Sequence, residues 1–162
     1  MLVSLARQEG MLALKGNTSK AGPTIEKYLS VFKEALSARD PKYKNYEIGY
    51  DWCCAYVYYL MKQAGYELDF MPVKSSIWHL AAVRTWYNWA IQEDIFIESS
   101  CPSEAGDLVL FDKLIKDKEL DHIGILLEIH QNYIITSEGN YHNCAGIFKR
   151  QKDSTVRGFI RL

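Results

Sequence analysis

One segment of this 162-residue chain combines a helix start with a candidate nucleophile, and it reads Asp51-Trp-Cys-Cys-Ala-Tyr-Val-Tyr-Tyr-Leu-Met-Lys-Gln-Ala-Gly65. Aspartate is a preferred N-cap residue and glycine commonly ends a helix, so the pattern predicts a helix with Asp51 as its N-cap. Cys53 then lies beside backbone N–H groups that have no intrahelical partner, at the positive end of the helix dipole. This position favours the thiolate, the nucleophilic form of cysteine.

Two interpretations of the cysteines are open at this point. Cys53 is either an activated nucleophile, whose neighbouring N–H groups could also bind an acyl oxyanion, or a small apolar residue of a buried helix. Cys54 points about 100° away around the helix, toward Tyr58 and Met61, and we expect it to pack. Four cysteines without C-x-x-C pairs predict free thiols, and the vicinal pair cannot form a disulfide without a strained ring.

Length and composition are those of an ordinary globular protein. The chain is 48% hydrophobic and 24% charged, and its length predicts one domain over residues 1–162. Its net charge of −1 lacks the basic excess of nucleic-acid and anionic-membrane binders, so we expect neither partner and a monomer. Charges at Arg7 and Glu9 interrupt the first apolar run. We therefore expect cytoplasmic synthesis without a signal peptide, and no membrane insertion.

Helical periodicity dominates the first part of the chain, about residues 1–92, and strand alternation the second, about residues 105–162. This segregation predicts an α+β fold with an antiparallel sheet. The expected elements are helices over 2–9, from a Thr24 cap to about residue 39, over 51–65 and over 76–92, a loop over 42–50, a turn over 102–106, and strands over 107–112, 121–129, 133–138, 145–150 and 156–161.

Of the four histidines, His122 has the best position to act as a base for a thiol. His79 lies in an aromatic-rich segment where we expect packing, and His130 lies at an expected hairpin turn where we expect solvation. His122 begins a strand and faces away from its apolar side, and Gly124 leaves room beside the imidazole for another group. The expected core face of this strand carries Ile123, Ile125, Leu127 and Ile129.

The hairpin that follows His122 predicts the partners of the imidazole. If residues 130–132 form a three-residue loop, paired positions sum to 262, which sets Gly124 opposite Glu138 and His122 opposite Asn140. Both polar side chains would then be within reach of the imidazole, where they could fix its tautomer and support its positive charge. A two-residue turn would instead place these side chains on the opposite face of the sheet from His122. The alternative, non-functional interpretations are that Glu138 is a solvated carboxylate at the end of a strand and that Asn140 is a turn residue.

Four segments, in this order, read Asp51-Trp-Cys-Cys-Ala-Tyr-Val57, Pro102-Ser-Glu-Ala-Gly-Asp-Leu-Val-Leu-Phe111, Asp121-His-Ile-Gly-Ile-Leu126 and Ser137-Glu-Gly-Asn140. They resemble the ordered motifs of CHAP domains, the cysteine, histidine-dependent amidohydrolases/peptidases related to NlpC-type cell-wall peptidases. The chain departs from the commonest pattern at Cys54, where a small residue is frequent, and at Tyr56, where Phe is frequent. The doubled cysteine offers two candidate nucleophiles, Cys53 and Cys54.

The resemblance implies a papain-like fold, with N-terminal helices packed on an antiparallel sheet of five to six strands, and no metal or organic cofactor. It implies that Cys53 is the nucleophile, His122 the base, Glu138 the group that orients His122, and Asn140 a support of the polar network or the oxyanion site. The implied substrates are peptidoglycan amides, cut next to muramic acid or within the peptide stem or cross-bridge. We expect four further residues to bind substrate: Tyr50, Asp51, Trp52 and Tyr141.

Three other functions are weighed against this one. A catalytically silent module would use the same groove to hold a glycan or peptide, and a minority of CHAP relatives cleave glutathionylspermidine instead of cell wall. A metal site formed by His142 and Cys144 with His130 or Asp121 lacks a recognised zinc spacing, so we expect no metal. If the partner is peptidoglycan or its peptide fragments, the chain needs a holin, a phage tail, a secretion machine or lysis to reach it.

Overall fold

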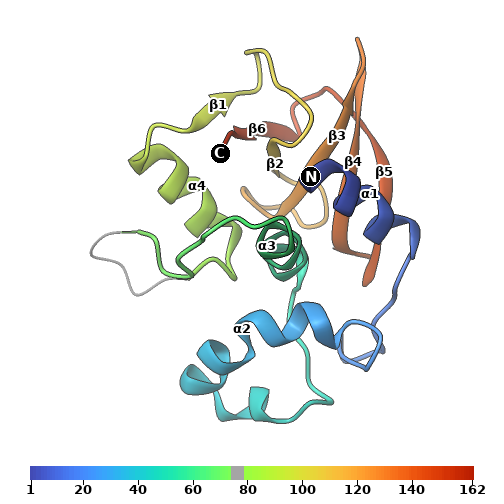
Figure 1. Ribbon diagram of the computed structural model, residues 1–162, viewed down its shortest axis with the longest axis vertical. Helices are drawn as coiled ribbons and strands as arrows, with labels where there is room; N and C mark the ends of the chain where they lie inside the picture. The colour runs from blue at the N-terminus through green and yellow to red at the C-terminus, as the bar shows by residue number, and fades with distance from the viewer. Residues whose placement is uncertain (74–78) are drawn as a thin grey trace.

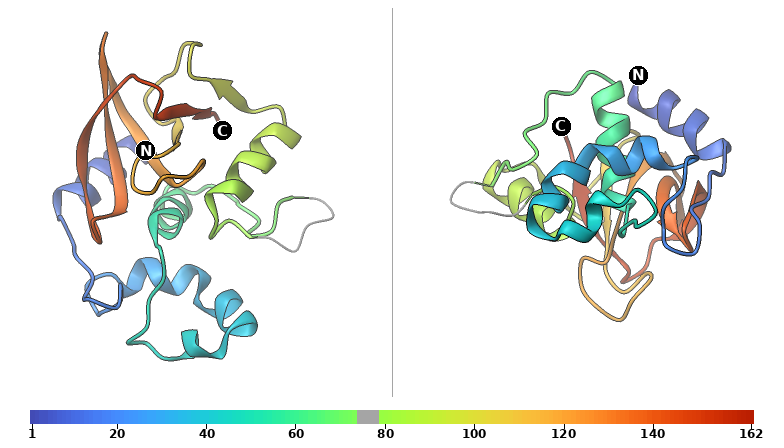
Figure 2. Two further views of the ribbon diagram at one scale, coloured as in Figure 1. Left: turned by 180° about the vertical axis from the view of Figure 1, so that it is seen from behind. Right: turned by 90° about the horizontal axis from the view of Figure 1, so that it is seen from below.

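The computed structural model describes residues 1–73 and 79–162, and it consists of helices packed against a six-stranded sheet (Figure 1). Helix α3 lies at the centre, between the sheet and α2, while α1 runs beside the strands β3 to β5 (Figures 1 and 2). The elements are α1 (Leu2–Met11), α2 (Glu26–Arg39), the 3₁₀ turn η1 (Pro41–Lys44), α3 (Cys53–Gln63), α4 (Val83–Gln92), β1 (Phe96–Glu98), β2 (Leu108–Phe111), β3 (His122–Ile129), β4 (Tyr133–Tyr141), β5 (Cys144–Gln151) and β6 (Val156–Ile160).

The sheet has the strand order β1-β6-β2-β3-β4-β5, and each neighbouring pair is antiparallel. One face packs on the helices, where Ile123, Ile125 and Leu127 are buried as expected. The other face carries a second apolar cluster of six buried residues, so both faces of the sheet are covered. The predicted α+β, papain-like class is confirmed. The second cluster consists of Val109, Phe111, Leu126, Ile134, Val156 and Phe159.

Several predicted element bounds are wrong. Helix α4 starts at Val83, not at residue 76; residues 79–82 are not helical, since Ala82 is extended, and residues 76–78 lie outside the described residues. Thr24 does not cap α2, because its hydroxyl donates to the Lys15 carbonyl and Ile25 is the N-cap. The short edge strand β1 was not predicted, and the expected loop over 42–50 contains η1.

The predicted three-residue loop of the β3–β4 hairpin is also wrong. The predicted pairing of Gly124 with Glu138, at the end of the hairpin away from the turn, is nevertheless correct. The backbone N–H of His130 donates to the Tyr133 carbonyl at 2.9 Å, so the turn consists of the two residues between them. A β-bulge at Leu127 then inserts one extra residue into β3 and restores the pairing of Gly124 with Glu138. Since side-chain faces alternate along a strand, the bulge also leaves Ile129 39% exposed, not in the expected core face.

Candidate active site

Cys53 is the first residue of α3, and Trp52, not Asp51, is the N-cap. The predicted cap is therefore displaced by one residue, and the Asp51 side chain makes no capping hydrogen bond to the helix. The thiol still lies in the first helical turn, where backbone N–H groups lack intrahelical acceptors and the helix dipole is positive. Only 5% of Cys53 is exposed, so the sulfur is held within the protein at the edge of a cavity.

The two adjacent thiols have opposite proton affinities. The neighbouring Cys54 thiol and the His122 imidazole lower the pKa of Cys53 well below its usual value, although burial and Asp51 oppose this. Burial and the negative charge on its neighbour raise the pKa of Cys54 well above the usual value. The geometry therefore favours a thiolate at Cys53 and a neutral thiol at Cys54, which is fully packed in the core.

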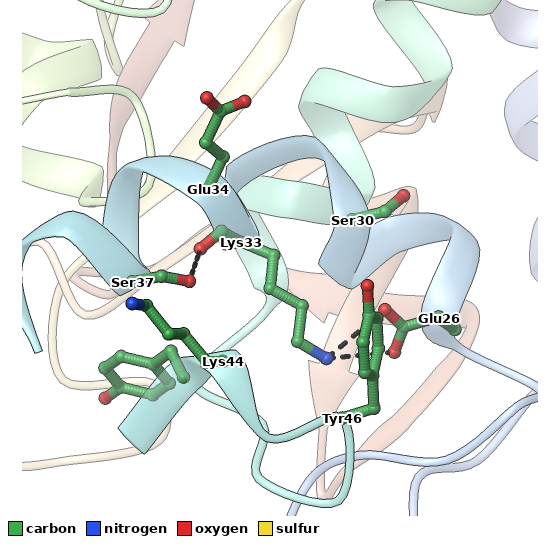
Figure 3. A pocket seen from close by; sticks show the side chains of 8 residues that line it. Glu26, Ser30, Lys33, Glu34, Ser37, Lys44 and Tyr46 are labelled. Atoms are coloured by element: carbon green, nitrogen blue, oxygen red, sulfur yellow. Dashed lines mark hydrogen bonds and ion pairs between the residues drawn. The ribbon is translucent and has the colours of Figure 1, made fainter. Parts of the chain in front are cut away.

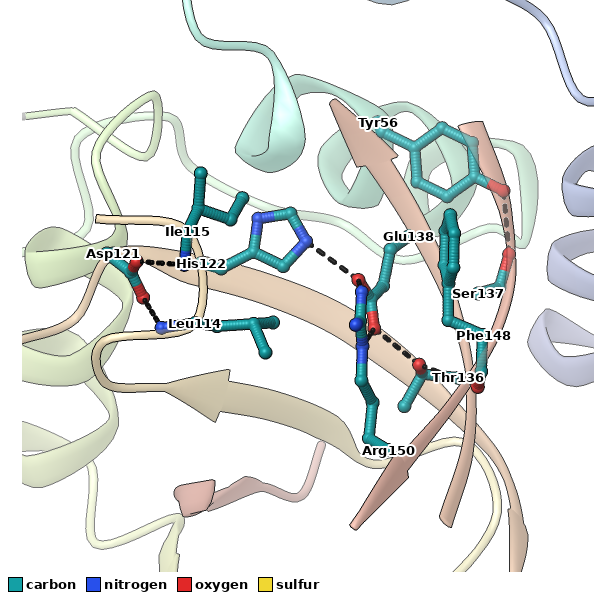
Figure 4. Close-up of polar contacts among 10 residues, drawn as sticks. All are labelled: Tyr56, Leu114, Ile115, Asp121, His122, Thr136, Ser137, Glu138, Phe148 and Arg150. Carbon is teal, nitrogen blue, oxygen red and sulfur yellow. Dashed lines mark hydrogen bonds and ion pairs between the residues drawn. The ribbon is translucent and has the colours of Figure 1, made fainter. Parts of the chain in front are cut away.

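His122 and Glu138 form a fully buried hydrogen-bonded pair on the strands β3 and β4 (Figure 4). The distance from His122 Nε2 to Glu138 Oε2 is 2.9 Å. Gly124 provides the space for this contact, because a Cβ atom there would lie 2.7 Å from Glu138 Cγ. The second ring nitrogen, Nδ1, has no hydrogen-bond partner of ordinary geometry among the described residues, and it is the nitrogen left to interact with the Cys53 thiol.

The carboxylate of Glu138 has further partners that the sequence analysis missed. Thr136 donates its hydroxyl to Oε1 at 2.5 Å, while Arg150 donates Nε to Oε1 at 2.9 Å and Nη2 to Oε2 at 2.6 Å. Each oxygen therefore accepts two hydrogen bonds, and a buried charge is fully compensated. Arg150 ends the expected strand over 145–150 directly after Lys149, and nothing in this stretch of sequence distinguishes it as a partner of Glu138.

Charge compensation determines the ionisation of this pair. Burial disfavours the charged form of Glu138, but the hydrogen bonds from Arg150 and His122 outweigh it and lower the pKa to about 2. Burial likewise disfavours a charged imidazole, yet the interaction with Cys53 and the hydrogen bond with Glu138 raise the pKa of His122 to about 10. The arrangement favours a thiolate, an imidazolium and a carboxylate in sequence, which is the form of a cysteine nucleophile ready for attack.

Asn140 does not lie opposite His122 as predicted. The pairing of β3 with β4 runs from Gly124–Glu138 to Ile129–Ile134, and Asn140 adopts a left-handed backbone conformation with a φ of 62°. Its amide Nδ2 lies 3.3 Å from Asp51 Oδ1 instead, and its Oδ1 is buried without a partner among the described residues. The asparagine therefore connects the end of β4 to the segment before Cys53.

Asp51 joins three segments at the edge of the site. It accepts a hydrogen bond from Lys20 and one of 2.7 Å from Lys116, in addition to the contact with Asn140. Burial opposes its charge, but the hydrogen bonds from the two lysines hold the pKa of the carboxyl well below its usual range. Since Asp51 is about half exposed, these ion pairs orient the loops more than they stabilise the fold.

The cavity beside Cys53 has a volume of about 570 Å³, large enough for part of a peptide. Its far walls come from the start of α4 and from the loop between β2 and β3, which Asp121 holds through hydrogen bonds from the backbone of Leu114, Ile115 and Lys116 (Figure 4). The lining is polar and carries both signs of charge. Its residues are Asp51, Cys53, Cys54, Ala81, Ala82, Val83, Arg84, Lys116, Lys118, Glu119, Leu120 and Asp121.

Of the four residues expected to bind substrate, Asp51 alone lines this cavity. Trp52 is fully buried, stacks on Tyr28 with ring centroids 5.4 Å apart, and donates Nε1 to Asn143, so the structure assigns it to the core. Tyr50 donates its hydroxyl to the Leu29 carbonyl at 2.6 Å. The Tyr141 ring lies against Arg150, with its centroid 4.0 Å from Cζ, and therefore supports the Glu138 network from behind.

A second hollow, of about 400 Å³, lies between α2 and η1, away from Cys53 (Figure 3). Lys33 crosses it, with Nζ 3.2 Å from Glu26 Oε1 and 4.2 Å from the centroid of the Tyr46 ring. These contacts fix the segment after α2 against the helix. None of the residues that line this hollow is a cysteine or a histidine, and none has a hydrogen bond to the His122–Glu138 pair.

His79 and His130 do not join the site. His79 stacks on Phe32 and is buried, while His130 stacks on Tyr133 and lies near Glu128. Across residues 1–73 and 79–162, no group of three or more His, Cys, Asp or Glu side chains is arranged to hold a metal ion. Within the same ranges, no helix is long and apolar enough to cross a bilayer.

Comparison with known families agrees with the helix-and-sheet arrangement and the Cys–His site. The model of the CHAP domain family matches residues 45–140, which include Cys53, His122 and Glu138. The chain belongs to the CHAP family. Members of this family are typically hydrolases, and the membership indicates a peptidoglycan amidase or peptidase activity in general. Comparisons with curated proteins and with solved structures found no match.

Proposed function

We propose that this protein is a cysteine-dependent amide hydrolase that cleaves peptidoglycan at an amide bond next to muramic acid or within the peptide. The observation that carries the proposal is the buried series of Cys53, His122 and Glu138, in which the thiol and the imidazole shift each other's pKa in the direction of an ion pair. A cavity of about 570 Å³ gives a substrate carbonyl access to the sulfur.

In the first half of the reaction, the Cys53 thiolate attacks the amide carbonyl. The developing oxyanion lies near the N–H groups at the start of α3, which have no intrahelical acceptor. The His122 imidazolium then gives its proton to the leaving amine, the C–N bond breaks, and a thioester with Cys53 remains. Glu138 holds the imidazole in orientation through its 2.9 Å contact with Nε2.

In the second half, His122, now neutral, takes a proton from water as the water oxygen attacks the thioester. The C–S bond breaks, the carboxylic acid product leaves, and the thiolate and imidazolium are restored. Asn140 acts in this scheme by holding Asp51 at the mouth of the cavity; among the described residues it has no hydrogen bond with the imidazole. The step needs no group beyond water and the side chains named.

Replacing each cysteine separately tests this assignment on purified peptidoglycan. Cys53→Ala should lower the rate by roughly 10³-fold or more, because it removes the nucleophile. Cys54→Ala is the comparison variant: the neighbouring thiol is buried and supports the Cys53 thiolate without being the nucleophile, so this variant should lose much less activity than Cys53→Ala and should also lose thermal stability. Equal loss of activity in both variants, or retained activity in Cys53→Ala, would reject Cys53 as the nucleophile.

Mass spectrometry of the digested peptidoglycan separates the possible bonds. A freed lactyl group identifies cleavage next to muramic acid, and new peptide amines identify cleavage within the stem or cross-bridge. If no fragment appears, release of spermidine from glutathionylspermidine tests the small-amide alternative. A Cys53 that also reacts no faster than a model thiol at mildly acidic pH would indicate a silent binding module.

A further inference from the structure

A guanidinium group on β5 clamps the carboxylate that faces the catalytic imidazole. Arg150 pairs with Ile134 in the β4–β5 register, and its side chain extends along the sheet to reach both oxygens of Glu138, at 2.9 and 2.6 Å (Figure 4). This is a bidentate contact, the geometry that gives an arginine–carboxylate pair both strength and a fixed orientation.

The clamp is itself held in place. The Arg150 side chain is only 10% exposed, and its Cζ lies 4.0 Å from the ring centroid of Tyr141 and 4.8 Å from that of Phe148. Both rings are packed against each other, with centroids 4.9 Å apart. An arginine in this position cannot lose its proton and has little freedom to move, so its charge stays beside Glu138 at every pH at which the protein is folded.

We propose that Arg150 is a positioning residue for the nucleophile: it keeps Glu138 ionised and aimed at His122, and thereby keeps the Cys53–His122 pair in its reactive form under acidic conditions. The inference rests on the proposed function, in which that pair carries out the chemistry. Without Arg150, the buried carboxylate would keep His122 as its one hydrogen-bonded cation and would lose two hydrogen bonds, so it would take up a proton at a higher pH. Once protonated, Glu138 would no longer support the imidazolium, and the thiolate would be lost.

Among the described residues, Arg150 is the one cation hydrogen-bonded to Glu138 whose charge does not depend on pH. The other cation with a hydrogen bond to Glu138 among these residues is His122, whose charge depends on pH. The other titratable groups that face the network are Tyr56 of α3 near Glu138, Tyr141 of β4 against Arg150, Cys53 of α3 against His122, and Asp51 and Lys116, which act on Cys53.

The pH dependence of Cys53 alkylation by iodoacetamide tests the inference without requiring peptidoglycan cleavage. The rate is followed on the Cys53 peptide by tandem mass spectrometry between pH 4 and pH 9, because other free cysteines also react. In Arg150→Met we expect the rate at about pH 5 to fall by about tenfold or more, while the rate at about pH 8.5 stays within about threefold of the parent. Arg150→Lys keeps the positive charge but cannot make the bidentate contact. Its alkylation rate at acidic pH should therefore lie between those of the parent and of Arg150→Met.

Arg161→Met is the matched control, because Arg161 makes the same bidentate contact with another buried carboxylate. Its Nε and Nη2 lie 3.0 and 2.8 Å from the two oxygens of Asp107, outside the site. This variant should lose thermal stability with no change in the pH profile of alkylation. If the Arg150→Met protein does not fold, the Arg150→Lys profile decides the question.

The outcomes separate this inference from the proposed function. A parent protein with fast acidic alkylation, and Arg150 variants with the same profile, would overturn the role of Arg150 and leave the hydrolase proposal intact. A shift of similar size in Arg161→Met would also overturn it, since the effect would then follow stability. A parent protein whose Cys53 reacts like a model thiol would reject the activated nucleophile, and with it the pair that Arg150 is inferred to position.

Discussion

The imidazole of His122 and the carboxylate of Glu138 meet at 2.9 Å, and both side chains are completely excluded from solvent. Burying a charged pair is favourable only where hydrogen bonds satisfy the remaining polar atoms. Here Arg150 and Thr136 supply those bonds to the carboxylate, and Cys53 interacts with the imidazole. The site is thus a connected network across β3, β4, β5 and the start of α3, and its members should fail together when one is removed.

The first prediction concerns Glu138→Gln. This change removes the carboxylate charge and leaves the buried Arg150 guanidinium without its counterion, so we expect a loss of about 3–5 kcal/mol of folding free energy. In the protein that remains folded, kcat on peptidoglycan should fall by about 10²-fold or more, because the imidazolium loses its support. Urea unfolding and steady-state kinetics measure the two effects. A variant with unchanged stability and rate would remove Glu138 from the network.

The second prediction concerns stability as a function of pH. The pKa of Glu138 is lowered from 4.5 to about 2, so its contribution to stability is complete above about pH 4.5 and disappears as the pH falls toward 2. The pKa of His122 is raised from 6.5 to about 10, so its contribution is complete below about pH 6.5 and disappears as the pH rises through 10. Between about pH 4.5 and 6.5, both contributions to the folding free energy are therefore complete.

Thermal unfolding of the parent and of His122→Gln between pH 4 and pH 10 measures the imidazole contribution. The difference in Tm should be constant in the acidic range and should shrink as the pH rises above about 6.5, because the parent then begins to lose its advantage. A difference that grows with pH would contradict the raised pKa. The acidic limb is assessed in the same way with Glu138→Gln below about pH 4.5.

The third prediction is that Gly124→Ala damages activity more than stability. The added Cβ would lie 2.7 Å from Glu138 Cγ and 3.2 Å from the Ser137 carbonyl, so the carboxylate must move away from the imidazole. A displacement of about 1 Å in a catalytic group is expected to reduce kcat/KM by about 10²-fold. The control is Gly10→Ala, whose Cβ would meet Ile147 Cγ1 and Ser137 Oγ at 2.9 Å, a similarly close contact that does not involve the Glu138 side chain. Equal kcat/KM for both variants would show that Glu138 tolerates the shift.

The fourth prediction is that Trp52→Phe lowers stability and leaves substrate affinity unchanged. The indole is buried, stacks on Tyr28 and bonds to Asn143, so its truncation should cost about 1–3 kcal/mol. KM on a soluble peptidoglycan fragment should equal that of the parent, since the side chain does not line the cavity. A raised KM with a normal Tm would contradict this prediction and would show that Trp52 binds substrate, as the sequence analysis expected.

The register of the β3–β4 hairpin shows what a local sequence pattern can and cannot predict. Pairing of Gly124 with Glu138 was predicted correctly, although through a three-residue loop that does not exist; the two-residue turn and the bulge at Leu127 compensate each other. A bulge is set by packing on both faces of the strand, and alternation of residue types does not reveal it. The position of Asn140 was missed for a related reason, since its backbone turns left-handed at the end of the strand.

The sequence by itself determined the helix that carries Cys53 to within a residue of its start, the strand that begins at His122, and the α+β order of the elements, because hydrophobic periodicity and helix-ending residues act over a few neighbouring positions. Tertiary structure alone decided that Arg150 clamps Glu138, that Trp52 belongs to the core, and that Asp51 joins Lys20, Lys116 and Asn140. These contacts join residues 12 to 89 positions apart. Their partners depend on strand register and on how α3 meets the sheet, which long-range packing fixes only in the folded chain.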